Sequence, residues 1–130
     1  MTLKLTLKPG EGVFIGGSRI EVLARGISTL LISGDAPVLR AEFAVDPSEV
    51  VDVPSRLRLV LQKMYFSGDM AAHHDEYFDL ARLLLLDYPT ALDWITVINK
   101  CLIVGDVYKA IKLAKEQSWR LPAAELKEAS

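Results

Sequence analysis

Three polar residues near the amino terminus share a pattern that could contact nucleic acid. Residues 3–8 alternate leucine with Lys4, Thr6 and Lys8, which is the two-residue period of a strand whose faces differ. The three polar side chains therefore lie on one face of a predicted strand. Arg40 follows in a later apolar segment, and its guanidinium group suits bidentate hydrogen bonds to guanine or phosphate. If the first and last strands are neighbours, directly or across a dimer, these four residues form one small RNA-binding patch.

The same pattern has a structural interpretation that stays open. Lysines on a strand often protect an exposed sheet edge from pairing with another chain. Of the 130 residues, 51% are hydrophobic and 25% are charged, with a net charge of −2. This composition is typical of a globular protein, and the charge excludes a strongly basic domain. RNA binding would therefore depend on a local patch that reads an exposed single-stranded loop.

A second candidate surface lies near the carboxyl terminus. Tyr108 and Lys109 follow Gly105-Asp106 and begin a predicted helix, on which Lys109 and Lys112 extend a basic face. This face could be solvated, could meet RNA phosphate or could meet an acidic partner. We take Tyr108, Lys109 and Lys112 as the candidate partner-binding residues.

The remaining reactive residues do not predict an enzyme. Adjacent His73 and His74 would point about 100° apart on a helix, so they cannot ligate one ion as an i, i+4 pair can. Cys101 lies in an apolar helical stretch, which predicts a buried structural thiol and no disulfide framework. We expect no catalytic residue, no metal and no cofactor, and a protein of the reducing cytoplasm.

The apolar period changes near residue 46, and the chain is expected to have an α+β fold. Residues 1–45 predict a small antiparallel β unit of about five strands. These strands are expected at about 2–8, 12–16, 18–25, 27–33 and 37–43. A β unit this small buries too little core alone, so it must pack on its own helices or pair with a second copy. The unit is thus the candidate for RNA binding and dimerisation.

Residues 46–130 predict an α-helical unit of about four helices, the candidate for partner binding. The first helix is expected to begin at Asp52 and to run through Met64. The others are expected at about 69–87, at about 90–104 with Thr90 as its N-cap, and from Asp106 to a stop at Pro122. We find no secretory signal and no apolar run long enough to span a bilayer, so no membrane association is expected.

Several segments resemble the FlbT family of flagellin regulators. They include Leu3-Lys4-Leu5-Thr6-Leu7-Lys8-Pro9-Gly10-Glu11, Phe14-Ile15-Gly16-Gly17, Ala36-Pro37-Val38-Leu39-Arg40 and Val107-Tyr108-Lys109-Ala110-Ile111-Lys112. The resemblance implies a post-transcriptional regulator that binds the 5′ untranslated region of flagellin mRNA and controls its translation and stability, as a repressor. It also implies a helical protein, FlaF, as a functional counterpart.

The β unit also resembles the RNA-binding repressor CsrA. The similar positions are Thr6, Gly10, Glu11, Ile15, Gly16, Arg40 and Glu42. CsrA interlocks two chains with first and last strands side by side, so this resemblance implies a homodimer through the β unit. Leu7 stands where CsrA has the first of two arginines, which leaves Lys8.

Two hypotheses of different classes follow. In the first, the protein binds flagellin mRNA through Lys4, Thr6, Lys8 and Arg40. In the second, it is a protein-interaction adaptor in flagellar biogenesis that acts through a helical partner without contacting RNA.

Overall fold

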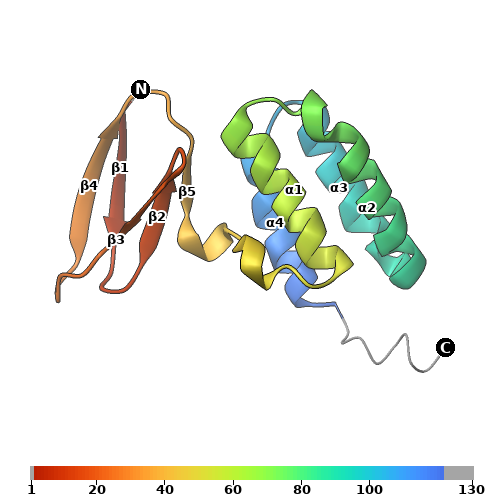
Figure 1. Cartoon of the computed structure of the whole chain (residues 1–130), viewed down its shortest axis with the longest axis horizontal. Helices are drawn as coiled ribbons and strands as arrows, with labels where there is room; N and C mark the ends of the chain where they lie inside the picture. The colour runs from red at the N-terminus through yellow and green to blue at the C-terminus, as the bar shows by residue number, and fades with distance from the viewer. Residues whose placement is uncertain (1, 122–130) are drawn as a thin grey trace. The chain divides into compact units, whose positions relative to one another are not determined.

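The computed structural model describes residues 2–121 (Figure 1). Its fold is α+β, as predicted, with antiparallel strands in two small sheets followed by helices. The chain divides into two compact units, Met1–Ala44 and Val45–Ser130. The predicted helix stop at Pro122 lies outside the described residues.

The first unit has two antiparallel sheets. One pairs β1 with β4, and the other has the strand order β3-β2-β5. The strands are β1 (Thr2–Leu7), β2 (Gly12–Ile15), β3 (Ser18–Glu21), β4 (Ser28–Ser33) and β5 (Val38–Arg40). Pro9 and Gly10 end β1 with a turn, in which Gly10 has a φ of 83° and the Glu11 N–H donates to the Lys8 carbonyl at 3.0 Å. Proline followed by a residue with positive φ is typical of a type II turn.

The alternation of β1 is confirmed. Leu5 and Leu7 are buried, whereas Lys4 and Thr6 are exposed. Leu5 and Leu7 form the core of the unit together with Val13 and Val22. Because buried leucines alternate with polar residues, the register of β1 decides which side chains face solvent.

Two strands are shorter than predicted. β3 ends at Glu21, and Val22 turns into the core, where its N–H donates to the Glu11 carbonyl at 3.0 Å. The strand expected at about 18–25 is therefore too long, since β3 ends four residues earlier. β5 ends at Arg40 because the chain continues into a 3₁₀ turn, Ala41–Phe43.

Up to residue 121, the second unit has four α-helices. They are α1 (Val53–Ser67), α2 (His74–Asp87), α3 (Leu92–Ile103) and α4 (Val107–Trp119). The predicted start at Asp52 is confirmed, because its carboxylate accepts from the Ser55 N–H at 3.0 Å in a capping box. The start at Asp106 is confirmed by the same kind of bond from the Lys109 N–H at 3.0 Å. Helix α1 packs against both α2 and α4, and α3 packs against α4.

Two other helix starts differ from the prediction. A 3₁₀ turn, Ala71–His73, precedes α2, which begins later than expected. Thr90 is not an N-cap, because it lies inside a second 3₁₀ turn, Pro89–Ala91, and α3 begins at Leu92 without a side-chain cap. Pro89 fixes φ in a helical range, so the Pro89–Ala91 turn forms before α3 and moves the start of α3 to Leu92.

A hydrogen bond between buried and half-buried side chains links two helices of the second unit. Tyr77 is fully buried, and its hydroxyl group donates to Asn99 Oδ1 at 2.7 Å, joining α2 to α3. Trp94 and Cys101 are also buried, and the buried thiol confirms the prediction for Cys101. Among the described residues, no helix has the length and apolar character needed to cross a membrane.

Candidate nucleic-acid interface

The exposed face of β1 presents Lys4 and Thr6 as predicted. Strands β1 and β4 pair with Lys4 opposite Leu31 and Thr6 opposite Thr29, and residues directly opposite in an antiparallel pair project to the same side. All four residues are exposed. The face therefore combines one ammonium group, two hydroxyl groups and an apolar side chain, which suits an unstacked base better than a duplex.

Arg40 lies beside β1 within a single chain. This half-buried residue ends β5, and its Nη2 atom donates to the Thr6 carbonyl at 3.2 Å. The bond spans the edges of two sheets, because β1 and β5 form no ladder with each other. A guanidinium group has five N–H donors, so this bond uses one of them. Arg40 thus joins two strands and also brings a positive charge to the end of β1.

Lys8 lies one residue beyond β1 and is exposed in the turn. Its backbone N–H donates to Glu11 Oε1 at 2.6 Å, which places a carboxylate at the same turn. A second carboxylate, that of the exposed Glu42, follows two residues after Arg40 in the sequence. Carboxylates therefore lie at the turn of Lys8 and two residues after Arg40, so general attraction to phosphate is weak at both positions.

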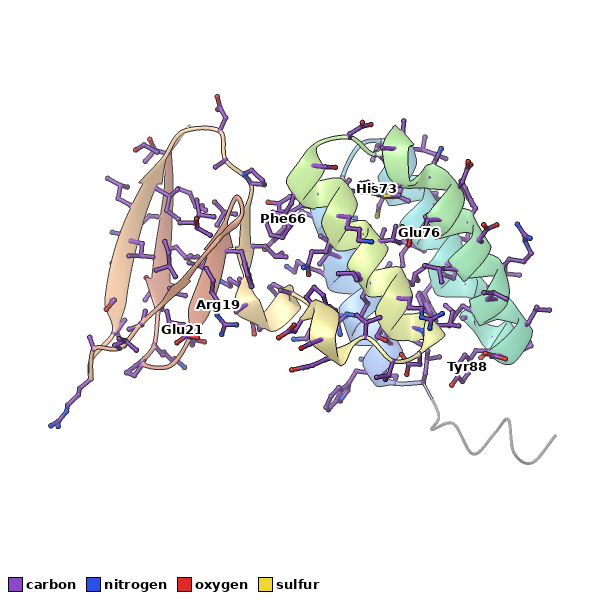
Figure 2. The ribbon with its side chains drawn as sticks, in the orientation of Figure 1. Arg19, Glu21, Phe66, His73, Glu76 and Tyr88 are labelled. Carbon is purple, nitrogen blue, oxygen red and sulfur yellow. The ribbon has the colours of Figure 1, made fainter. Side chains whose placement is uncertain are left out.

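Another arginine of the β unit is engaged by an acidic side chain. Arg19 Nη2 lies 2.9 Å from Glu21 Oε1 on β3, and Figure 2 shows the two side chains near each other. The Arg19 guanidinium group also lies 5.7 Å from the centroid of the Phe14 ring. Glu21 offsets its charge, so Arg19 does not add a strong cation to the candidate interface.

The three candidate partner-binding residues lie together at the start of α4. Lys112 Nζ lies 5.5 Å from the centroid of the Tyr108 ring, within cation–π range. The Lys109 N–H is held by the Asp106 cap, while the Lys109 side chain is exposed. The predicted grouping of an aromatic ring with basic side chains is thus present, but its role in binding remains a prediction.

A hollow that no pattern in the sequence predicted adjoins Tyr108. This hollow has a volume of about 380 Å³ and is lined by Met64, Tyr65, Met70 and Tyr108, together with the Gly105–Val107 segment. The Tyr65 and Tyr108 ring centroids are 6.0 Å apart. Met64 and Tyr65 lie near the end of α1, before its Gly68 C-cap, and only the packing of α1 against α4 brings them to Tyr108.

The histidine pair does not form a metal-ligand cluster. Within residues 2–121, no three His, Cys, Asp or Glu side chains are placed to hold a metal ion. His74 lies with its ring centroid 5.0 Å from that of Phe78. Glu76, labelled with His73 in Figure 2, has its Oε1 atom 3.9 Å from Lys63 Nζ on α1. These contacts account for the segment as part of the helix surface.

Comparison with known proteins identifies relatives along nearly the whole chain. A family model described as flagellar protein FlbT matches residues 3–118. A probable flagellum biosynthesis repressor, FlbT 1 of Bradyrhizobium diazoefficiens, is 33% identical over 117 residues, covering 89% of this chain and 80% of the relative. The probable repressor FlbT of Rhodopseudomonas palustris is 34% identical over 113 residues, covering 86% and 88%.

A more distant relative is the flagellum biosynthesis repressor FlbT of Caulobacter vibrioides. It is 26% identical over 124 residues, covering 89% of this chain and 84% of the relative. No solved structure matches the chain, so the likeness of the β unit to CsrA stays a prediction. The resemblance found in the sequence is confirmed by the match to residues 3–118, and the chain belongs to the FlbT family of flagellar proteins.

Proposed function

We propose that this protein represses flagellum biosynthesis in the cytoplasm by binding the 5′ untranslated region of flagellin mRNA. Its relatives are named flagellum biosynthesis repressors, which supports the repressor role. The RNA contacts are assigned to Lys4, Thr6, Lys8 and Arg40. A regulator of this kind needs a surface for a single-stranded leader and needs no catalytic group.

The observation that carries the proposal is the contact between Arg40 and Thr6. The 3.2 Å bond from Arg40 Nη2 to the Thr6 carbonyl holds the guanidinium group at the end of the strand that exposes Lys4 and Thr6. This contact joins Arg40 to the backbone of a residue 34 positions earlier in the sequence, which supports including Arg40 with the β1 residues. The remaining N–H groups of Arg40 can donate to a phosphate or to a guanine edge.

The mixed charge of the patch indicates the kind of RNA that it suits. Glu11 and Glu42 reduce general attraction to a phosphate backbone near Lys8 and Arg40. Binding would then depend on a few directed contacts to splayed bases in a loop, with a small number of phosphate contacts. This favours a specific leader structure over arbitrary RNA.

Substitution of Arg40 tests the proposal. We expect Arg40→Ala to weaken binding to a flagellin leader RNA by about 1–3 kcal/mol, which is about 5- to 150-fold in Kd. The assay is a gel-shift titration at fixed salt with purified full-length protein. Arg25→Ala is the matched control, because Arg25 is an exposed arginine in the connection between β3 and β4.

Folding must be checked beside affinity, since Arg40 also joins two strands. Circular dichroism should show that the variant keeps its secondary structure at the titration temperature. If folded Arg40→Ala binds the leader as tightly as Arg25→Ala does, Arg40 is not an RNA contact. If neither the native protein nor any variant binds the leader, the RNA-binding function is wrong.

A second candidate function is supported by the hollow beside Tyr108. We propose that an adaptor role would use this hollow for an apolar side chain of a helical partner, with Lys109 meeting acidic residues around it. FlaF is the partner implied by the family resemblance. Tyr108→Ala should then abolish FlaF binding in calorimetry, whereas Phe78→Ala, which removes another exposed ring, should not. FlaF binding unaffected by Tyr108→Ala would exclude this surface.

A further inference from the structure

Strand β4 has one edge without a neighbouring strand. Its residues, Ser28–Ser33, pair with β1 along their full length, and no third strand between residues 2 and 121 joins this sheet. In an antiparallel pair, every second residue of a strand directs its backbone N–H and C=O groups away from the partner strand. Half of the β4 residues therefore direct these groups away from β1. Across residues 2–121, no backbone hydrogen bond from another segment reaches these outward groups.

This edge also lacks the usual protection. The β4 sequence, STLLIS, contains no charged residue and no proline. By contrast, β3 carries the Arg19–Glu21 ion pair, and Arg40 donates to the β1 edge. Natural edge strands are commonly blocked by charges, by proline or by covering segments. An unprotected six-residue edge is therefore a candidate for pairing.

The exposed side chains of β4 favour the same conclusion. Leu31 is 70% exposed and lies opposite Lys4. Leu30 and Ile32, which point to the other side, pack partly against the core of the unit. A two-stranded sheet is marginal by itself, and further strands with an apolar face stabilise it.

We propose that β4 pairs antiparallel with β4 of a second copy of this chain, about a two-fold axis at Leu31. Residues opposite each other must project to the same face, which restricts the register. With the axis at Leu31, Leu30 lies opposite Ile32 of the second copy. The sheet faces that pack on the two cores therefore lie on the same side of the joined sheet. The product is a four-stranded sheet with β1 of each copy at its edges.

The chemistry of the edge selects a second copy over a different strand. An uncharged strand pairs with itself without placing like charges opposite each other, and it offers no charge to recruit a complementary strand. At the axis, the exposed Leu31 side chain also packs beside Leu31 of the second copy. A perpendicular two-fold axis leaves Lys4 and Thr6 of both copies on one face of the sheet.

The oligomeric state of the full chain tests the interface. Sedimentation equilibrium should show a concentration-dependent species of twice the 14.4 kDa chain mass. Leu31→Glu places a carboxylate opposite Lys4 within each chain, which favours the hairpin, but sets two carboxylates together at the axis. We expect this variant to raise the dimer dissociation constant by at least about tenfold.

Leu23→Glu is the matched control. Leu23 is 90% exposed in the connection between β3 and β4, outside any strand, so the same substitution there should leave the dimer unchanged. A protein that stays monomeric at all concentrations would overturn the proposal. A dimer that folded Leu31→Glu leaves intact would also overturn it, because another surface would then hold the two copies.

Cross-linking tests the register independently. Directly opposed residues have Cβ atoms about 4.5–5.5 Å apart, so Leu31→Cys should form an intermolecular disulfide under mild oxidation. Leu23→Cys should not, and the native chain supplies the background because its Cys101 is buried. Failure of Leu31→Cys to cross-link faster than Leu23→Cys would refute the axis at Leu31. Arg40→Ala should leave dimerisation unchanged, so failure of RNA binding and failure of dimerisation are separable.

Discussion

The buried hydroxyl group of Tyr77 gives a stability prediction whose size follows from the structure. Tyr77→Phe removes the 2.7 Å hydrogen bond to Asn99 Oδ1 while keeping the fully buried ring. The half-buried Asn99 then loses its donor, which costs about 1–2 kcal/mol of unfolding free energy. Because only an oxygen atom is removed, the cavity contribution is small.

The same residue should make the helical unit sensitive to alkaline pH. Burial, with a smaller electrostatic contribution from the nearby Cys101, raises the pKa of Tyr77 above its ordinary value. The folded chain therefore keeps the phenol protonated at a pH where the unfolded chain ionises it. This contribution to stability is fully present below about pH 10 and falls above it, by about 1.4 kcal/mol per pH unit. Tyr77→Phe should lose that part of the pH dependence.

Urea unfolding followed by circular dichroism at 222 nm measures both effects. We expect a lower midpoint for Tyr77→Phe at pH 7 and a shallower decline in stability between pH 10 and 11. The double variant with Asn99→Ala should be less destabilised than the sum of the single variants, because the two residues share one bond. Equal stability of native protein and Tyr77→Phe at pH 7, with equal alkaline slopes, would refute the reasoning.

Three smaller predictions concern local features. Asp52→Ala should lower stability by about 1 kcal/mol, because the capping box with Ser55 is lost; an unchanged urea midpoint would contradict this. Gly68→Ala should cost about 1 kcal/mol in the same assay from its φ of 66° alone, since an added Cβ meets nothing within 4 Å. The Cys101 thiol should react with a disulfide reagent far more slowly in the folded chain than in urea, because it is buried; similar rates would contradict its burial.

Local signals in the sequence predicted much of the fold. Alternating leucines located β1 and its exposed face, because the period of a strand is fixed by its backbone. Asp52 and Asp106 marked two helix starts, since a cap needs only a side chain three residues before its donor. Thr90 matched the same pattern, but the prediction that it is an N-cap was wrong because a 3₁₀ turn begins at Pro89 and includes Thr90.

Long-range pairing could not be predicted in the same way. Nothing in the sequence indicates that β1 pairs with β4, or that Lys4 lies opposite Leu31. The run Leu30-Leu31-Ile32 does not show which leucine faces solvent until that register is known. Arg40 could be proposed as a neighbour of β1 within a chain or across a dimer, and only the folded chain shows the bond to Thr6.

The proposed RNA patch and the proposed β4 interface place their groups on one sheet face. A single copy offers few cations there, with Glu11 close to Lys8, so its affinity for RNA should be modest. Two copies on one sheet would present Lys4 and Thr6 twice, and a second contact made within one complex gains from effective concentration. The disulfide-linked Leu31→Cys dimer should then bind the leader RNA more tightly than the reduced Leu31→Cys chain, measured below the dimer dissociation constant, because residue 31 is the same in both. Equal RNA affinities of the oxidised and reduced forms would show that the patch acts within one chain.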